Sequence, residues 1–383
     1  MSKSKIVIAA DSFKGSASSM EVENFIEKGI RRVAVNVEIV KIPIADGGEG
    51  TVDSLVSACK GKYVYEKVTG PLGNKVKAKY GMLYGNTAII EMAEASGLQY
   101  VDKTTMNPFK TTTYGTGELI RSALGRGAKT IYVGLGGSAT NDGGAGMAEA
   151  LGVSFKDKKG REIRLGAEGV NEIETIDVSH LDPRFADVEI IGLTDVTNPL
   201  CGKNGASFIY GPQKGAKAED LPMLDGILFR YAEKIKEQLG MDVADAKGAG
   251  AAGGLGAGLL AFCGAKLERG IAKVLELVNL EQHVKDADLV ITGEGKIDNQ
   301  SVNGKAPIGV AQLAKKYGIP VIAVAGSADD DLQAVYEHGI DLVIDAVPKP
   351  IALNEAIANA EKLITNAGET AYRAFCLAKR AEK

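Results

Sequence analysis

The sequence predicts an α/β protein with a doubly wound parallel sheet and a second, inserted α/β domain that contains antiparallel strands. Short apolar segments alternate with helical segments near both ends of the chain, as they do when helices cover both faces of a parallel sheet. In the middle of the chain, short strands follow one another with turn residues between them, which is typical of antiparallel pairing.

The alternation near the start of the chain consists of two strand–helix pairs. Strand Ile6–Ala10 precedes helix Ser19–Val33, and strand Val37–Pro43 precedes helix Thr51–Cys59. The alternation resumes late in the chain with strands Asp288–Thr292, Pro320–Ala325 and Asp341–Ala346 and with helices Ile308–Tyr317, Leu332–His338 and one from Asn354. Such a domain is Rossmann-like or flavodoxin-like.

The middle of the chain follows a different pattern. Strands Lys62–Val68, Lys75–Leu83 and Thr87–Met92 are separated by glycine-containing turns and predict an antiparallel meander. Strand Val188–Leu193 and helix Met223–Leu239 follow, and strand Thr130–Val133 fits either domain. We therefore expect a discontinuous Rossmann-like domain of residues 1–60 and 285–383, an inserted domain of residues 61–284, and an active site in the cleft between them.

Composition narrows the class of protein. The 383 residues are 45% hydrophobic and 25% charged, as in ordinary globular proteins, and the net charge of -4 weighs against a nucleic-acid or membrane-surface partner. The four cysteines are scattered without a C-x-x-C pair, which favours reduced thiols and a cytoplasmic location. The apolar run that ends at Asp11 is too short for a signal peptide.

The most informative segment is the glycine-rich run from Gly134 to Met147. It follows an apolar strand and leads into a helix, an arrangement that presents backbone N–H groups to an anion. Asn141 and Asp142 lie inside the run, where an acid fits a bound cation or a hydroxyl that must lose its proton. The alternative is a tight turn capped by one of these two residues.

Two further runs also place acids among glycines at the end of a strand. Asp46 and Glu49 lie in the segment 42–51, and Glu294, Lys296 and Asp298 follow the strand that we expect to end at Thr292. Ligands of open α/β sheets bind beyond the carboxyl ends of the strands. Three such runs therefore indicate one polar site assembled from distant parts of the chain.

One segment, Gly248–Ala265, carries no charge. Its glycines and alanines are too weakly hydrophobic for a membrane span. We interpret it as a glycine-rich loop leading into helix Leu255–Cys263, which brings backbone close either to a ligand or to a neighbouring helix.

Nine motifs, spread in order over nearly the whole chain, carry a resemblance to a known family. They are Asp11–Ser16, Ala45–Thr51, Glu91–Leu98, Thr113–Leu119, Gly136–Gly146, Asp195–Gly202, Gly211–Gly215, Ile291–Asp298 and Gly304–Gly309. Together they resemble the bacterial glycerate kinase family, of the glycerate 2-kinase type. One position departs from that pattern, since Thr194 stands before Asp195 where a cysteine is expected.

The resemblance implies phosphorylation of D-glycerate by ATP with Mg²⁺, giving 2-phospho-D-glycerate in glyoxylate and glucarate catabolism. It also implies a two-domain fold with the site between domains. Glycerate and ATP are the expected partners, and a homodimer is the one assembly considered, with the oligomeric state left open. The alternatives are a glycerate 3-kinase, a non-catalytic sugar-acid-binding regulator and a nicotinamide-dependent dehydrogenase; the last lacks a good dinucleotide fingerprint.

Phosphoryl transfer needs positive charge, a metal and an oriented hydroxyl, and these needs suggest roles for the residues. Lys14 is interpreted as a clamp for phosphate or for the glycerate carboxylate, or else as a solvated loop lysine. Asp46 and Asp195 are the candidate catalytic bases that would take the proton from the hydroxyl, and Asp46 could instead hold Mg²⁺. The alternatives are helix N-capping for Asp46 and an Asx-turn for Asp195. The expected substrate- or nucleotide-binding residues are Gly47, Gly48, Glu49, Gly136, Gly137, Ser138, Asn141, Glu294 and Lys296. The expected metal ligands are Asp142 and Asp298.

Overall fold

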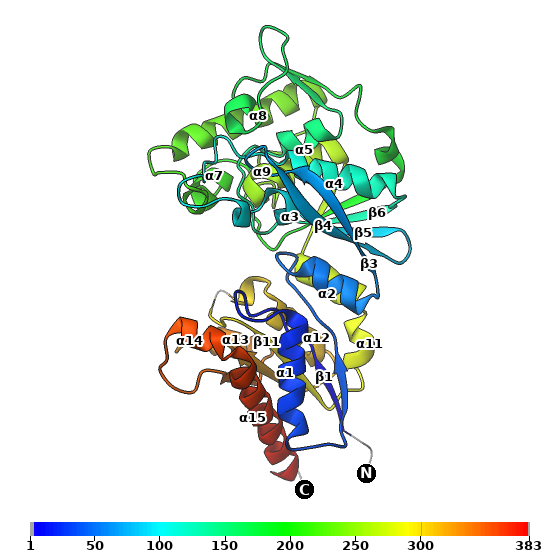
Figure 1. Cartoon of the computed structure of the whole chain (residues 1–383), viewed down its shortest axis with the longest axis vertical. Helices are drawn as coiled ribbons and strands as arrows, with labels where there is room; N and C mark the ends of the chain where they lie inside the picture. Colours follow the sequence, from blue (N-terminus) through cyan, green and yellow to red (C-terminus); the bar gives the residue numbers. More distant parts are fainter. Residues whose placement is uncertain (1–3, 300, 382–383) are drawn as a thin grey trace. The chain divides into compact units, whose positions relative to one another are not determined.

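The computed structural model describes residues 4–299 and 301–381, which fall into two compact units (Figure 1). Unit 1 comprises the described residues up to Asp46, the segment Asp53–Cys59 and the described residues from Gly270 onward. Unit 2 comprises Gly47–Val52 and Lys60–Arg269. The polypeptide therefore passes from unit 1 to unit 2 and back twice, and the second passage, Lys60–Arg269, supplies most of unit 2.

Unit 1 is built on a five-stranded sheet in which every pair of neighbours is parallel. Its order is β13-β12-β11-β1-β2, with bounds β1 (Lys5–Ile8), β2 (Glu38–Lys41), β11 (Leu289–Glu294), β12 (Val321–Ala325) and β13 (Leu342–Asp345). This is the flavodoxin-like order, and the direction of winding reverses between β1 and β11. The expected doubly wound parallel sheet is confirmed.

Helices α1 (Ser19–Arg31) and α15 (Ala360–Ala381) lie side by side against one face of this sheet (Figure 1). The α1 residues Val22, Ile26 and Ile30 share a hydrophobic core with the strand residues Ile6 and Ile8. Neighbouring strand residues point to the opposite face. Helix α12 (Ala306–Lys315) packs there on β11 and β12, and α10 (Gly270–Leu277) and α11 (Leu280–Val284) pack on α12.

Three shorter helices complete the regular structure of unit 1. They are α2 (Thr51–Ala58), whose first two residues are grouped with unit 2, α13 (Gln333–Glu337) and α14 (Leu353–Ala358). Contacts group α10 and α11 with unit 1, whereas the sequence predicts that the inserted domain ends at residue 284. The domain boundaries stay a prediction.

Unit 2 is built on a six-stranded mixed sheet with the order β10-β9-β6-β5-β4-β3. The strands are β3 (Lys62–Thr69), β4 (Lys75–Leu83), β5 (Thr87–Glu91), β6 (Thr130–Gly134), β9 (Glu189–Leu193) and β10 (Lys266–Glu268). The expected meander is confirmed in β3, β4 and β5, and from β5 to β10 the neighbours are parallel. A separate antiparallel pair joins β7 (Ser154–Lys156) to β8 (Thr175–Asp177).

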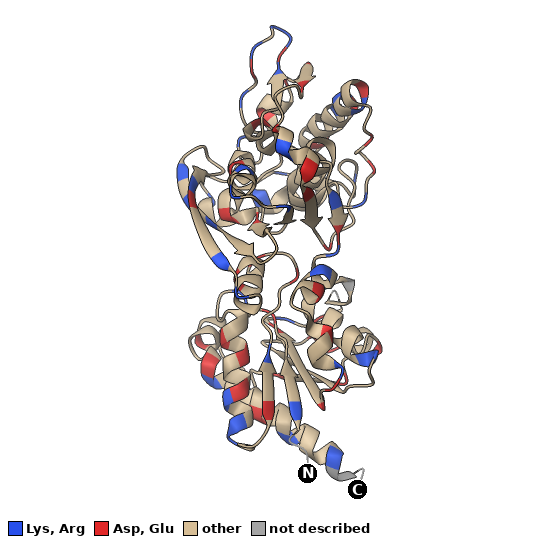
Figure 2. Cartoon of the chain, turned by 90° about the vertical axis from the view of Figure 1, so that its right-hand side faces the viewer, with Lys and Arg blue, Asp and Glu red and all other residues tan. Residues whose placement is uncertain are grey.

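The helices of unit 2 enclose two hydrophobic cores. They are α3 (Ala93–Ser96), α4 (Tyr114–Gly125), α5 (Ala145–Ala150), α6 (Ala167–Val170), α7 (Ala206–Tyr210), α8 (Leu221–Leu239) and α9 (Ala251–Cys263). One core lies on the sheet around Ile90 and Val133, and the other gathers under α8 around Phe155 and Tyr231. Among the described residues, no helix combines the length and the apolar character that crossing a bilayer requires. Figure 2 shows basic and acidic residues interspersed along the helices, strands and loops of the chain.

The charge-free segment is explained by close packing. Ala252, Gly253 and Gly254 adopt positive φ at the start of α9. A Cβ on Gly253 would lie 1.9 Å from the carbonyl oxygen of Thr140, and one on Gly258 would lie 2.8 Å from that of Gly143. These glycines therefore let α9 pack closely against the turn at residues 140–144. Of the two interpretations of this segment, close approach to a ligand or close packing, the contacts agree with packing.

The contact between α1 and α15 depends on two glycines. A Cβ on Gly29 would lie 2.0 Å from the carbonyl oxygen of Thr365, and one on Gly368 would lie 2.7 Å from the Cα of Ile26. The two helices therefore meet backbone to backbone, and no side chain fits at either position.

We expect Gly29→Ala to lower stability by about 1–3 kcal/mol, because the added methyl overpacks this contact. The matched control is Gly226→Ala in α8, where the nearest atom to the new Cβ is the Arg230 guanidinium at 3.4 Å. That change should raise stability by up to about 1 kcal/mol through helix propensity. Urea denaturation followed by circular dichroism measures both; a Gly29→Ala midpoint at or above the wild-type value would contradict the packing.

Candidate active site

Three carboxylates of unit 1 follow neighbouring parallel strands. Asp11 lies just beyond β1, Asp46 lies beyond β2, and Glu294 is the last residue of β11. Asp11 is 5% exposed and Glu294 is 7% exposed, while Asp46 is partly buried. Because the carboxyl ends of parallel strands share one edge, the acids converge beside the point where the winding reverses.

The buried acids hold their protons more tightly than acids in water. Burial, followed by the charge of Asp46, raises the pKa of Asp11 to about 7, although a hydrogen bond from the Ser12 N–H (2.6 Å) and the charge of Lys14 oppose this. Burial also raises the pKa of Glu294, against the influence of Lys305 and Ser301. Burial thus favours the protonated, neutral forms of Asp11 and Glu294 over their carboxylates.

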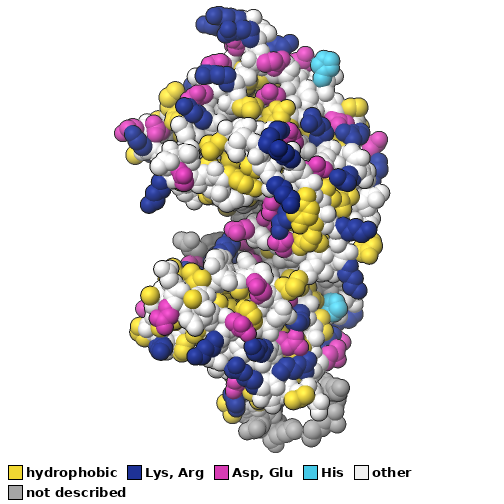
Figure 3. Space-filling view, in the orientation of Figure 1, with side chains coloured by type: hydrophobic (Ala, Val, Ile, Leu, Met, Phe, Trp, Pro, Cys, Tyr) yellow, Lys and Arg dark blue, Asp and Glu magenta, His cyan; other side chains and the backbone are white. Residues whose placement is uncertain are grey.

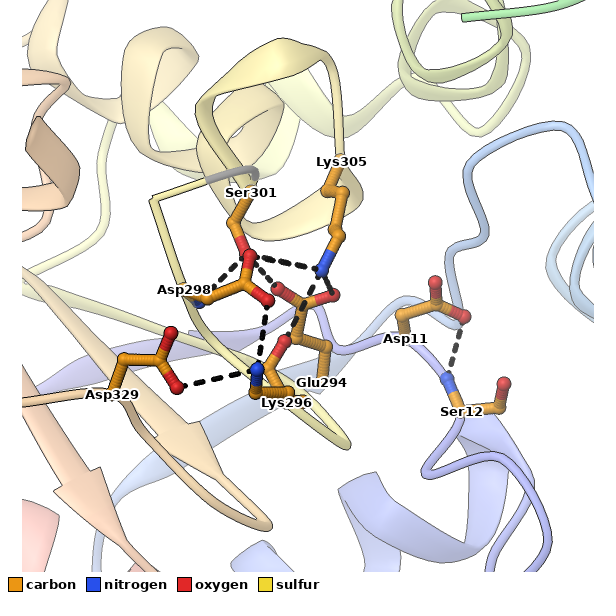
Figure 4. A network of polar contacts seen from close by, with 8 residues as sticks. All are labelled: Asp11, Ser12, Glu294, Lys296, Asp298, Ser301, Lys305 and Asp329. Carbon is orange, nitrogen blue, oxygen red and sulfur yellow. Dashed lines mark hydrogen bonds and ion pairs between the residues drawn. The ribbon is translucent and has the colours of Figure 1, made fainter. Parts of the chain in front are cut away.

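On the side of Glu294 away from Asp11, lysines, a serine hydroxyl and two further acids form a network of polar contacts (Figure 4). The Ser301 hydroxyl donates to Glu294 Oε1 over 2.8 Å, and the Lys305 ammonium lies 3.4 Å from Glu294 Oε2 and 3.8 Å from an oxygen of Asp298. Lys296 lies 3.2 Å from carboxylate oxygens of both Asp298 and Asp329. Glu294, Asp298 and Lys305 are therefore each held by more than one contact of the network.

Several residues singled out in the sequence thus come together in unit 1: Lys14, Asp46, Glu294, Lys296 and Asp298. Their chemical roles stay predictions. Sequence reasoning missed Asp11, Ser301 and Lys305 as site residues. Asp11 carried a usable signal, because it is the first acid after the first strand of a parallel sheet. Glu294 was expected beyond its strand, but β11 continues through it and pairs it with Ala325.

Two of the predicted glycine runs meet in unit 2. A Cβ on Gly134 would lie 2.4 Å from the carbonyl oxygen of Gly47, and one on Gly136 would lie 2.8 Å from the Cα of Gly48. The Val52 N–H donates to Glu91 Oε1 at the end of β5 over 2.7 Å. The segment 47–52 is therefore anchored on the ends of β5 and β6, and the side chain of Glu49 within it is exposed.

The polar residues of the glycine-rich run are buried. Asp142, which has no exposed surface, accepts hydrogen bonds from the Thr113 N–H (2.8 Å), the Thr113 hydroxyl (2.9 Å) and the Gly144 N–H (3.2 Å). Burial raises the pKa of Asp142 despite these bonds. The Asn141 amide donates to the Ser207 hydroxyl over 3.0 Å. These contacts fix the shape of the turn.

A buried lysine supports the same turn. The Lys214 ammonium donates to the carbonyl oxygen of Thr140 over 2.6 Å, and burial lowers the pKa of Lys214 to about 7 while the charge of Asp142 opposes that shift. Ser138 is buried beside Thr140, with the two hydroxyl oxygens 2.9 Å apart. Asp195 lies two residues after the end of β9 and is partly buried. Sequence reasoning did not assign Lys214 a role.

The raised pKa of Asp11 has a consequence for stability. Between pH 3.8 and about 7 the folded protein keeps a proton that the unfolded chain loses, so the free energy of unfolding falls as pH rises through this window. Asp11→Asn removes the buried charge. We expect its melting temperature, measured in EDTA, to exceed that of wild type at pH 8, with the difference shrinking toward pH 4.

The control for this measurement is Asp187→Asn, which changes an exposed carboxylate of unit 2 and should shift the melting temperature little at either pH. If Asp11→Asn melts below wild type at pH 8, or shifts the melting temperature equally at pH 4 and pH 8, the carboxylate is not held in the environment described.

Comparisons with known proteins agree with one another. The family model described as "Glycerate kinase family" matches residues 6–376. The chain is 51% identical to a glycerate 2-kinase of Escherichia coli K12, covering 98% of this chain and 99% of the relative, and 50% identical to a glycerate kinase of Bacillus subtilis 168, covering 98% of each.

A crystal structure of a protein assigned as glycerate kinase 2 in Salmonella typhimurium LT2 is similar with a TM-score of 0.88 and 48% identity, over 99% of this chain and 100% of that one. The family model spans both units, and the relatives match almost end to end. The chain therefore belongs to the glycerate kinase family.

Proposed function

We propose that the protein transfers the terminal phosphoryl group of ATP to the 2-hydroxyl of D-glycerate, giving 2-phosphoglycerate and ADP in small-acid catabolism. The observation that carries the proposal is the convergence of Asp11, Asp46 and Glu294 at the strand ends of unit 1, in a chain that belongs to the glycerate kinase family. The 2-position is favoured by the relative named glycerate 2-kinase.

Magnesium fits the chemistry of these carboxylates. Among the described residues, no three His, Cys, Asp or Glu side chains form a ready-made metal cage. Magnesium usually binds through one or two carboxylates together with phosphates and waters, so a cage is not needed. Asp11 and Glu294 would hold it, because a nearby cation compensates their buried charge. When bound, it neutralises charge on the phosphoryl group.

Other side chains have roles that need no metal. Asp46 is the less buried carboxylate and adjoins the glycine-rich segment that begins at Gly47, so we assign it to the reacting hydroxyl, whose proton it would accept. Lys14 is exposed beside Asp11 and would contact a phosphate. Asp142 already accepts three hydrogen bonds within its turn, and a structural role suits it better than the expected role of metal ligand.

The first test is product identity. Purified protein supplied with ATP, MgCl₂ and D-glycerate should release ADP, and phosphorus NMR should detect 2-phosphoglycerate. A dominant 3-phosphoglycerate signal would move the reaction to the other hydroxyl. Absence of ADP with every small hydroxy acid tried would refute the kinase proposal for this chain.

The second test concerns Asp46. Asp46→Asn should lower kcat on the order of a hundredfold or more with an unchanged melting temperature, because a proton acceptor acts mainly as charge builds in the transition state. A capping role would instead lower stability by about 1 kcal/mol and leave kcat intact. Asp330→Asn, at an exposed carboxylate after β12, is the control and should keep wild-type turnover.

A further inference from the structure

We propose that a cavity of about 640 Å³ within unit 1 binds the adenine nucleotide, with the base toward helix α14 and the phosphates toward Lys14. The inference rests on the proposed function, and it adds a place for one of the two substrates. The cavity is walled by the residues after β11, β12 and β13, by α14 and by the start of α15. It therefore opens at the carboxyl edge of the sheet, where ligands of this fold bind.

The outer wall of the cavity is apolar. Ile351, Leu353, Ile357 and Leu363 line it, and Leu353 is 74% exposed although it is a large hydrophobic residue. Hydrophobic side chains gather at the left edge of the lower half in Figure 3, where Figure 1 draws α14. A flat purine ring buries its faces against such residues, and ligand pockets are commonly lined in this way.

The inner end of the cavity is polar and is lined by residues with small side chains or none. Gly295, Gly326 and Ser327 line it, and a Cβ on Gly326 would lie 2.6 Å from the carbonyl oxygen of Gly295. Backbone is therefore exposed to a ligand here without intervening side chains. Lys14 and Lys349 also line the cavity and supply the positive charge that a polyphosphate needs.

The direction of the nucleotide follows from what adjoins each end. Gly295 directly follows Glu294, and the Lys14 charge lowers the pKa of Asp11, so the lysine is close to both the cavity and the carboxylate cluster. Phosphates at this end would reach Asp11 and Glu294. Asp345, at the end of β13, also lines the cavity and offers a carboxylate to ribose hydroxyls.

Glycerate is a poorer occupant of this cavity. It has three carbons and carries a polar group on each, so the apolar wall would leave its hydroxyls without partners. The volume of about 640 Å³ is within the range of roughly 300–1,000 Å³ that holds larger ligands. The cavity therefore fits a nucleoside with phosphates better than it fits the small acid.

The test is Ala356→Trp, which fills the cavity from α14. The matched control is Ala358→Trp, at an exposed position of the same helix that does not line the cavity. In calorimetric titrations with ADP and Mg²⁺, the Kd for ADP should rise about tenfold or more in Ala356→Trp and should equal the wild-type value in Ala358→Trp. The KM for ATP should rise in parallel, while the KM for D-glycerate stays within about twofold of wild type.

A second pair of variants covers the case in which Ala356→Trp fails to fold. Leu353→Glu places a negative charge on the apolar wall at a side chain already 74% exposed, and Leu377→Glu places one on α15 outside the cavity, at a side chain 65% exposed. Only Leu353→Glu should weaken ADP binding.

The outcomes separate this inference from the proposed function. Wild-type ADP affinity in folded Ala356→Trp and in Leu353→Glu would overturn the cavity as the nucleotide site while leaving kinase activity standing. A wild-type protein that phosphorylates no hydroxy acid and binds no adenine nucleotide would refute both. Weakened ADP binding in the cavity variants alone supports the inference whatever acid is the acceptor.

Discussion

Asp11 and Glu294 are buried close to a third acid, Asp46. The parallel pairing of β2, β1 and β11 keeps the three acids at the same edge of the sheet. A buried carboxylate is stable when it is protonated or paired. Lys305 and Ser301 compensate one side of Glu294, while the other side faces the strand ends. Burial therefore raises the pKa of both Asp11 and Glu294 and favours their protonated forms.

Unit 2 depends on a different constraint, the approach of backbone to backbone. The segment at Gly47 and Gly48 touches the glycines after β6, and the turn at residues 140–144 touches the start of α9. At such distances any side chain would clash. Inside the turn, Asp142 and Lys214 then bond to backbone groups that no helix or strand satisfies. The glycines allow the close backbone contacts, and the buried side chains of Asp142 and Lys214 supply hydrogen bonds to the backbone groups that these contacts bury.

The sequence was sufficient for the parallel sheet of unit 1 and the meander of unit 2, because both follow from short-range apolar patterns. It failed for α4, where Gly115 and Gly117 depress helix propensity; they are required because their added Cβ atoms would lie 1.9 Å from the carbonyl oxygen of Thr69 and 2.3 Å from that of Met147. It singled out Asp46 and Glu294 as candidates because acids were expected to follow the strands, although Glu294 is the last residue of β11. It could not identify Lys305 or Lys214, since their partners are fixed only by tertiary packing.

The order of strands in unit 1 also bears on how the chain is made. Strand β1 pairs with its near neighbour β2 on one side, but on the other side it pairs with β11, and α1 packs on α15, so part of the surface of β1 and α1 is covered only by residues from the C-terminal part of unit 1. Residues Lys60–Arg269, by contrast, form a continuous stretch of unit 2. Because domains tend to fold as units during synthesis, we expect unit 2 to fold before unit 1. The side of α1 that packs on α15 therefore stays uncovered until Ala360–Ala381 has been synthesised.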